Sequence, residues 1–247
     1  MQGPAFFVLS SGRCGTMTLA HIFALAPNGR VWHHPEPLLV SETLDAYLGR
    51  GDDTEVFRAA RGHLIKGAWL EGLVHGETDH NMTAFAPTIA ELMPQARFLV
   101  AIRHPAPFVR SGMRRGWYEG HSWDHGRLRP SPEQPIAAQW DRLPTFEKIC
   151  WLWAETYRRI LHIYETLPAD RRALLRFEDL VGRRVDWRAL FDFLGLTFPG
   201  SGPIEEILDQ RLNRQEKGEF PTADAWSEAQ RSTLVAYCGA IGAAFGV

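Results

Sequence analysis

The chain has 247 residues, of which 45% are hydrophobic and 23% charged, and its formal net charge is −2. This length and composition fit a single α/β domain over residues 1–247 with an adequate core, and the lack of a basic excess argues against nucleic acid or an anionic membrane as partner. Three widely spaced cysteines form neither a disulfide framework nor a CxxC metal pattern, and no apolar stretch is long enough to span a membrane, so we expect a cytoplasmic protein.

The first elements follow the order strand, glycine loop, helix. Residues 5–9 (AFFVL) are apolar throughout, as in a strand that is buried on both faces. A Gly-rich loop at 10–16 and a helix at 18–26 complete an opening that is typical of nucleotide-binding α/β folds. A second short strand at 31–32 ends in a loop, residues 33–37 (HHPEP), which its prolines make rigid.

The middle of the chain alternates between helical and strand patterns. We predict a helix at 43–62, a weak strand at 63–65, a helix at 85–93, a strand at 97–102 and a helix at 107–115. Lys66 follows the weak strand, and Arg103 stands at the carboxyl end of the strand at 97–102, the clearest in the chain.

Residues 116–145 are rich in Gly, Pro, His and Trp and predict a long loop or lid on the acceptor side. The remaining expected elements are an amphipathic helix over 146–164, a strand at 173–175, a helix at 185–194, a polar loop at 212–224 and a last helix. Ser227 and Gln230 form a capping-box pattern that opens that last helix. The alternation implies a three-layer α/β fold, with a mostly parallel sheet flanked by helices on both faces.

The segment 10–18 (SSGRCGTMT) is built to hold an anion. Its glycines allow backbone N–H groups to point inward, and the helix start adds a positive dipole end. Arg13 adds a charged, forked donor, and Thr16 and Thr18 add hydroxyls. The ATP-type loop needs a lysine that is missing here, and Cys14 is interpreted as a small space-filling residue. The alternative is merely a tight turn between strand and helix.

A second anion contact is predicted over residues 103–111 (RHPAPFVRS). An arginine at the end of a parallel strand faces the crevice in which open α/β sheets bind ligands. Arg103 and Ser111 could hold a second phosphate there; alternatively, Arg103 pairs with a carboxylate and Ser111 is only a surface residue.

These segments resemble those of the PAPS-dependent sulfotransferase family, where PAPS is 3′-phosphoadenosine-5′-phosphosulfate. Residues 11–19 resemble the 5′-phosphosulfate loop in its arginine form, and residues 103–111 resemble the 3′-phosphate motif. Residues 175–180 (LRFEDL) resemble a late family signature, and 213–220 (NRQEKGEF) resemble the glycine loop that closes over the cofactor. Cys14 and Met17 depart from the serine and threonine that the family often has.

The resemblance implies a P-loop-like sulfotransferase architecture that binds PAPS and releases PAP. The cofactor-binding residues that it implies are Gly12, Arg13, Cys14, Gly15, Thr16, Met17, Thr18, Arg103, Ser111, Arg214, Lys217 and Gly218.

Three residues are candidates for catalysis. Arg13 is placed to neutralise charge on the transferring group. Glu36 is the candidate base, with His33 and His34 as rivals, and a merely solvated Glu36 is the alternative. By resemblance, Lys66 would touch the bridging oxygen; otherwise it is an ordinary exposed lysine. We expect no metal, because no third ligand with useful spacing accompanies the two histidines and Glu36.

The expected reaction moves a sulfuryl group from PAPS to a hydroxyl or amine of a small-molecule or glycan acceptor. Trp117, Tyr118, His121 and Trp123 could form the acceptor pocket, whereas Trp151 and Trp153 are expected in the core. Two other functions stay open: a P-loop-type small-molecule kinase, and a PAP-binding protein without turnover. The sequence does not indicate the oligomeric state.

Overall fold

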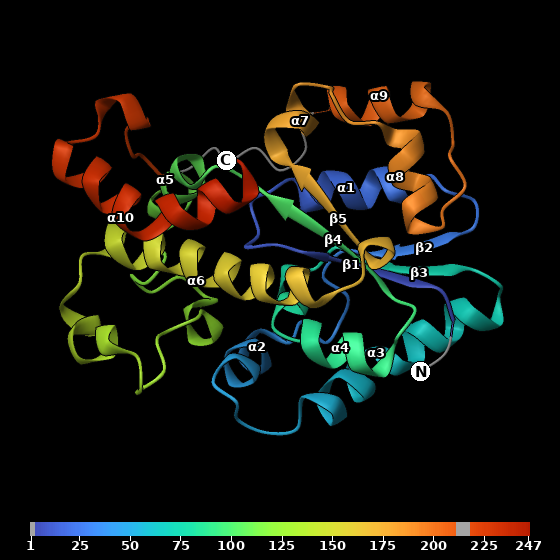
Figure 1. The fold of residues 1–247 in the computed structure, drawn as a ribbon, viewed down its shortest axis with the longest axis horizontal. Coiled ribbons are helices and arrows are strands. Elements are labelled where there is room, and N and C mark those ends of the chain that lie inside the picture. Colours follow the sequence, from blue (N-terminus) through green and yellow to red (C-terminus); the bar gives the residue numbers. More distant parts are fainter. Residues whose placement is uncertain (1–2, 211–217) are drawn as a thin grey trace.

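Five parallel strands form one sheet in the order β2-β3-β1-β4-β5 (Figure 1). The computed structural model describes residues 3–210 and 218–247. The strands are β1 (Ala5–Leu9), β2 (Gly29–Trp32), β3 (Val74–Glu77), β4 (Arg97–Ile102) and β5 (Arg172–Arg176). Helices flank this sheet, so the predicted α/β class is confirmed.

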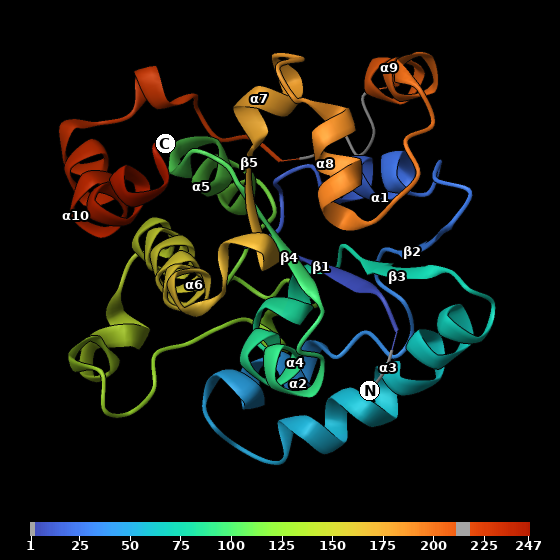
Figure 2. The ribbon, with the colours of Figure 1, turned by 45° about the vertical axis from the view of Figure 1, so that its right-hand side comes forward.

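The side chains of β1 alternate between two hydrophobic cores, one on each face of the sheet. Phe7 and Leu9 pack into one core, and Phe6 and Val8 pack into the other, with all four fully buried. One face is covered by α1 (Thr16–Phe23), α7 (Phe177–Val181), α8 (Trp187–Leu194) and α9 (Ser201–Asp209). The other is covered by α2 (Val40–Tyr47), α3 (Asp53–Leu70), α4 (Ala86–Leu92), α5 (Pro105–Met113), α6 (Thr145–Thr166) and α10 (Glu228–Phe245). Figure 2 shows α1, α8 and α9 on the opposite side of the sheet from α3 and α4.

Two predicted elements between the second and fourth strands are wrong. The single helix at 43–62 is two helices, α2 and α3, because Gly49 and Gly51 turn the chain with φ of 66° and 92°. Asp52 then begins α3 by accepting a hydrogen bond from the Glu55 N–H at 3.0 Å. The strand predicted at 63–65 lies inside α3, and the strand that lies between β2 and β1 in the sheet is β3, at residues 74–77.

The long loop predicted over 116–145 contains only short 3₁₀ turns, η2 (Asp124–Gly126) and η3 (Pro135–Arg142). The other 3₁₀ turns are η1 (His80–Thr83), η4 (Ala169–Arg171) and η5 (Ala223–Ala225). The capping box of Ser227 and Gln230 at the start of α10 is confirmed, as is the core position of Trp151 and Trp153.

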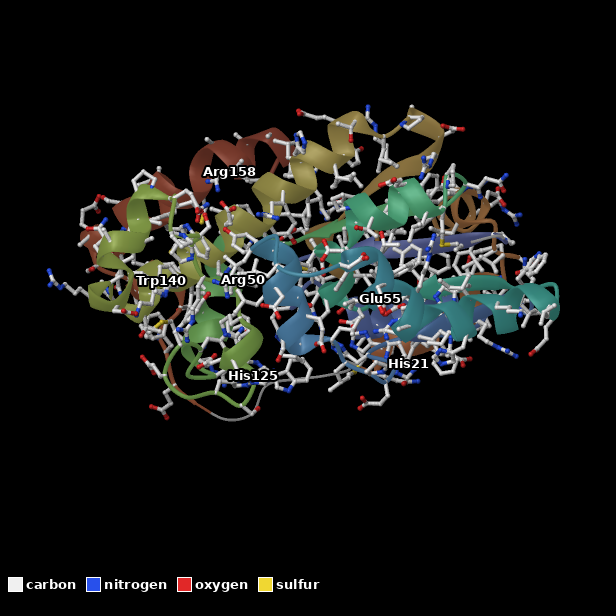
Figure 3. All side chains as sticks on the ribbon, turned by 90° about the horizontal axis from the view of Figure 1, so that it is seen from below. His21, Arg50, Glu55, His125, Trp140 and Arg158 are labelled. Carbon is white, nitrogen blue, oxygen red and sulfur yellow. The ribbon has the colours of Figure 1, made fainter. Side chains whose placement is uncertain are left out.

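Charged side chains lie mainly on the outer surfaces of the helices. Figure 3 labels His21, Arg50, Glu55 and Arg158, all of which are exposed. No helix within residues 3–210 and 218–247 is long and apolar enough to cross a membrane. The charged groups that are buried, in contrast, concentrate at the carboxyl end of the sheet, where parallel α/β folds place their ligands.

Candidate functional site

The loop between β1 and α1, residues 10–15, has the backbone of an anion site, and we call it the anion loop. Gly12, Arg13 and Gly15 all adopt left-handed φ angles of 76°, 59° and 80°. A Cβ on Gly15 would lie 2.8 Å from the Leu180 Cδ2 atom, so only glycine fits there. No side chain caps the start of α1, which leaves its first N–H groups available to a ligand. A non-glycine residue held in this region costs about 1–3 kcal/mol, and such strain clusters at functional sites.

The structure brings together the three residues that the sequence assigned to phosphate binding. The Nε of Arg13 donates to the Ser111 hydroxyl at 3.2 Å, and a terminal nitrogen of Arg103 donates to the Arg13 carbonyl at 3.1 Å. The predicted proximity of the two motifs is therefore confirmed. Burial, followed by the charges of Arg115 and Arg103, lowers the pKa of Arg13 to about 10, so it is still cationic at neutral pH.

Arg13, Arg103 and Arg115 form no ion pair in the part of the chain that the structure describes, although the charge of Glu178 acts on Arg103. Neither Arg13, Arg103 nor Arg115 forms an ion pair with a carboxylate there. The Nε atoms of Arg103 and Arg115 are buried without a hydrogen-bond acceptor among the same residues. Arg103 instead stacks on the Phe177 ring at 4.4 Å. Because buried donors without acceptors are rare in folded proteins, these groups point to an anionic ligand.

Cys14 faces the protein core. Its Sγ donates to the Gly12 carbonyl at 3.0 Å and lies 3.2 Å from the Tyr157 hydroxyl. Burial raises the pKa of this thiol, so it stays protonated at neutral pH. The loop can therefore offer an anion the backbone of Cys14 but not its side chain. Thr16 and Met17 line the adjoining cavity, whereas Thr18 does not.

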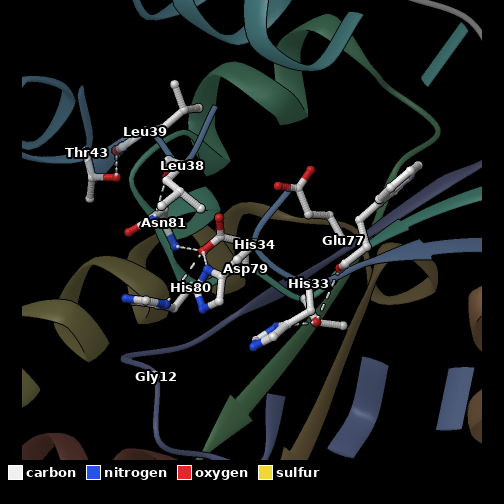
Figure 4. A network of polar contacts seen from close by, with 12 residues as sticks. Gly12, His33, His34, Leu38, Leu39, Thr43, Glu77, Asp79, His80 and Asn81 are labelled. Atoms are coloured by element: carbon white, nitrogen blue, oxygen red, sulfur yellow. Dashed lines mark hydrogen bonds and ion pairs between the residues drawn. The ribbon is translucent and has the colours of Figure 1, made fainter. Parts of the chain in front are cut away.

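A second cluster, which we call the histidine wall, consists of His33, His34, Asp79 and His80 (Figure 4). His33 and His34 follow β2, and Asp79 and His80 follow β3. The Nδ1 atoms of His34 and His80 lie 3.0 and 3.6 Å from the same Asp79 oxygen, Oδ1. The expectation that no third ligand accompanies the histidines is wrong, because parallel pairing of β2 with β3 brings Asp79 and His80 beside them.

The protonation of the histidine wall follows from its burial. Burial lowers the pKa of His33 and of His80 to about 4 each. Burial opposes the charge on Asp79, but contact with His34 and the nearby charge of His80 keep the pKa of this carboxyl below its usual value.

A fully buried cluster of charged side chains lies on the core side of the histidine wall. The Arg61 Nε of α3 donates to Glu77 at 2.7 Å, and one Arg61 terminal nitrogen donates to the Pro37 carbonyl at 2.9 Å. The other terminal nitrogen lies 3.7 Å from Asp79 Oδ2. Arg61, Glu77 and Asp79 are all 0% exposed. Arg61 therefore ties the 33–37 loop to the end of β3.

A cavity of about 420 Å³ joins the anion loop to the histidine wall. This volume is in the range of small-molecule sites. Its polar lining includes Arg13, His33, His34, His80, Asn81, Arg115, His121 and Arg127, and its apolar lining includes Val40, Tyr47, Trp117, Trp123, Leu128 and Leu152. Of the four pocket residues predicted from the long loop, Tyr118 alone is not a lining residue; its hydroxyl donates to the Leu128 carbonyl at 2.6 Å.

Glu36 and Lys66 lie away from the cavity. The loop turns His33 and His34 inward, so Glu36 is exposed and does not line the cavity, contrary to what a base must do. Lys66 does not follow a strand but lies on the exposed side of α3, and it does not line the cavity either. Neither placement supports the predicted catalytic role.

The predicted glycine loop is described only in part. Arg214 and Lys217 lie outside the described residues. Gly218 has a φ of 75°, and a Cβ there would lie 2.0 Å from the Arg114 carbonyl oxygen. Its own carbonyl accepts a hydrogen bond from Arg114 Nε at 2.8 Å, so Gly218 anchors this segment to the end of α5.

Sequence reasoning missed Asp79, His80, Arg61 and Arg115. The sequence of β3, VHGE, carries two ionisable residues, so it did not read as a buried strand, although all four residues are buried. The Asp-His pair two residues further on was the available signal, since strand ends carry ligand-binding groups in this fold class.

Comparisons with known proteins agree with this geometry. A family model described as "Sulfotransferase family" matches residues 67–200, more than half of the chain. No sequence among curated proteins matches. A sulfotransferase from Alicyclobacillus acidocaldarius superposes with a TM-score of 0.57 at 14% identity, over 99% of this chain and 95% of that one. The sulfotransferase domain of the Synechococcus PCC 7002 olefin synthase gives 0.53 at 15%, over 96% and 94%.

At such identities the superpositions show a common fold, while the family match covers the Arg103–Ser111 motif, the long loop at 116–145 and the LRFEDL segment. The chain belongs to the sulfotransferase family.

Proposed function

We propose that the chain transfers a sulfuryl group from PAPS to a hydroxyl or amine of a small-molecule acceptor. The observation that carries this proposal is the set of three arginines, Arg13, Arg103 and Arg115, which surround a left-handed glycine loop and have no carboxylate partner among the described residues. Membership of the sulfotransferase family supports sulfuryl transfer in general, and the arginines support an anionic donor.

The residues present fit a donor with anionic groups at two ends. The loop N–H groups and Arg13 would hold the 5′-phosphosulfate, and Arg103 with Ser111 would hold the 3′-phosphate. The buried Nε donor of Arg103 would then gain an acceptor. When bound, PAPS supplies the sulfuryl group and a phosphate leaving group, and Arg13 stabilises the negative charge that develops between them.

The cavity favours an acceptor with an apolar body. Trp117, Trp123 and Leu152 are among its apolar lining residues, whereas His33 and His34 form its polar wall beside the anion loop. An acceptor that packs on the aromatic side would present its hydroxyl or amine toward these imidazoles. His33 and His34 thus replace Glu36 as the groups placed to receive the acceptor proton.

The experiment that tests the donor is calorimetric binding of PAP and 5′-AMP to the wild type and to Arg103→Ala. A hydrogen bond to a charged group is worth about 1.5–3 kcal/mol, so PAP affinity should fall about 10- to 100-fold and 5′-AMP affinity should hardly change. Arg50→Ala, which removes an exposed arginine that does not line the cavity, is the matched control. Equal affinity of the wild type for PAP and 5′-AMP would reject PAPS as the donor.

Turnover is tested separately, with radiolabelled PAPS and a panel of aromatic alcohols and amines. A labelled product that disappears in Arg13→Ala supports the transferase. PAP binding with no labelled product from any acceptor in the panel would favour a nucleotide-binding protein without turnover.

A further inference from the structure

Three side chains of the histidine wall converge on a single point. His34 comes from the loop after β2, and Asp79 and His80 come from the end of β3 (Figure 4). One potential ligand atom from each lies within 4.8 Å of the other two. His34 and His80 line the cavity, whereas Asp79 lies behind them and is fully buried.

His34 Nδ1 and Asp79 Oδ1 form an ion pair. The two atoms are 3.0 Å apart, yet His34 Nδ1 is buried with no hydrogen-bond partner of acceptable geometry among the described residues. Asp79 Oδ2 also lacks a hydrogen-bond partner within that part of the chain. His34 Nδ1 and Asp79 Oδ2 therefore have hydrogen-bonding capacity that the described residues do not use.

The two distances to Asp79 Oδ1 match the coordination shell of a small metal ion, and the ligand atoms of His34 and His80 lie within 4.8 Å of each other. Zinc binds imidazole nitrogen at about 2.0–2.1 Å and carboxylate oxygen at about 2.0–2.2 Å, so two ligands of a tetrahedral site lie about 3.3 Å apart. The two contacts to Asp79 Oδ1, at 3.0 and 3.6 Å, bracket that value. Two imidazoles and one carboxylate are also a donor set found in catalytic zinc sites.

The charges behind the histidine wall favour a cation, whereas Arg13 and Arg127 act on His80 from the cavity side. The fully buried ionisable groups behind the wall are two carboxylates, Glu77 and Asp79, one guanidinium, Arg61, and the His75 imidazole, whose Nε2 lies 3.7 Å from Glu77. Arg61 bonds Glu77 directly but lies 3.7 Å from Asp79, so the Asp79 charge is only partly compensated. The Asn81 N–H donates to Asp79 Oδ1 at 2.9 Å and orients the carboxylate, as outer groups do in metal sites.

We propose that His34, Asp79 and His80 bind one divalent transition-metal ion, with zinc best suited to the donor set. The remaining coordination positions would face the cavity, because the two histidines line it. The site adjoins the anion loop, since a Cβ on Gly12 would lie 3.4 Å from the His80 ring. This proposal replaces the earlier expectation that no metal takes part.

The role of the ion rests on the proposed sulfuryl transfer: it would hold the acceptor oxygen beside the anion loop. With His34 engaged as a ligand, His33 remains as the cavity imidazole that can receive the acceptor proton. The His33 Nδ1 atom lies 2.9 Å from the Thr78 hydroxyl and so is not aimed at the three ligands, although the His33 and His34 ring centroids are only 4.2 Å apart.

The test uses the full chain, stripped with a chelator and then titrated with Co²⁺ while visible absorption is followed. Zn²⁺ stoichiometry is measured by mass spectrometry after dialysis. One ion per chain is expected. His34→Ala and His80→Ala should each weaken binding by more than the roughly 10–100-fold typical of losing an outer-shell group. His33→Ala, which removes the neighbouring imidazole, is the matched control and should bind as the wild type does.

Because Asp79 is fully buried, Asp79→Asn serves as a further variant that preserves its shape, and circular dichroism verifies the fold of each protein. Failure of the wild type to retain Co²⁺, or equal binding by folded His80→Ala and wild type, would overturn the metal site. PAP binding is measured on the same preparations: PAP binding without Co²⁺ binding rejects only the metal site, and Co²⁺ binding without PAP binding rejects only the proposed donor.

Discussion

The two ends of the cavity treat buried charge in opposite ways. At the cationic end, Arg13 and Arg115 line the cavity and Arg103 donates to the Arg13 carbonyl, and none of the three forms an ion pair with a carboxylate among the described residues. Behind the histidine wall, Arg61 is bound to Glu77 and lies near Asp79. The cationic end keeps positive charge available for a ligand, whereas Arg61 uses its charge to hold the wall together. The same residue type is thus buried in an ion pair at one end and forms none among the described residues at the other.

The largest expected effect is on the free energy of unfolding, and it distinguishes Arg61 from Arg115. Arg61→Met leaves Glu77 and Asp79 buried without their guanidinium, and removing one partner of a buried ion pair typically costs about 3–5 kcal/mol. Arg115→Met removes a guanidinium that has no ion pair among the described residues, so the free energy of unfolding should change by no more than about 0.5 kcal/mol. Urea unfolding of both variants measures the difference. Equal losses of stability would mean that the two ends do not differ in this way.

The second prediction concerns catalysis at the cationic end. Arg13→Ala should lower kcat by about 10²–10³-fold, the usual cost of removing a donor aimed at developing charge, with a smaller loss of PAP affinity. Steady-state kinetics with an acceptor found in the screen would measure both. An unchanged kcat with a raised KM would instead show that Arg13 only holds the donor.

Sequence patterns predicted the cationic end better than the histidine wall, because the residues of the anion loop are adjacent in the sequence and those of the wall are not. The anion loop is one continuous segment, and its glycines and arginine predict an anion-binding backbone. Arg103 follows a strand that is apolar over nearly its whole length. The histidine wall, in contrast, needs the register between β2 and β3, which places Trp32 opposite Glu77 and so brings His34 near Asp79. Because β3 is short and carries His75 and Glu77, no hydrophobic pattern marked it as a strand.

Glu36 shows a further limit of sequence patterns. Its position after β2 was predicted correctly, but the side on which a loop presents each residue depends on backbone angles. His34 has a left-handed φ of 54°, in a loop that turns both histidines into the cavity and leaves Glu36 exposed. Local composition alone therefore could not predict which residues of this loop, the histidines or Glu36, face the cavity.

The smallest expected effect tests which side of the anion loop faces the ligand. Cys14 Sγ contacts Tyr157 and the Gly12 carbonyl on the core side, and a serine hydroxyl can make hydrogen bonds to the same two groups. Cys14→Ser should therefore keep PAP affinity and kcat within about threefold of the wild type, because the exchanged atom faces the core and keeps both contacts. Calorimetry and steady-state kinetics would measure both.

Cys14→Val removes these hydrogen bonds and should lower stability more than PAP affinity, because the backbone N–H groups stay in place. A loss of PAP binding above about tenfold in the serine variant, with its melting temperature unchanged, would show that the thiol faces the ligand, and that the loop backbone and Arg13 do not hold the anion alone.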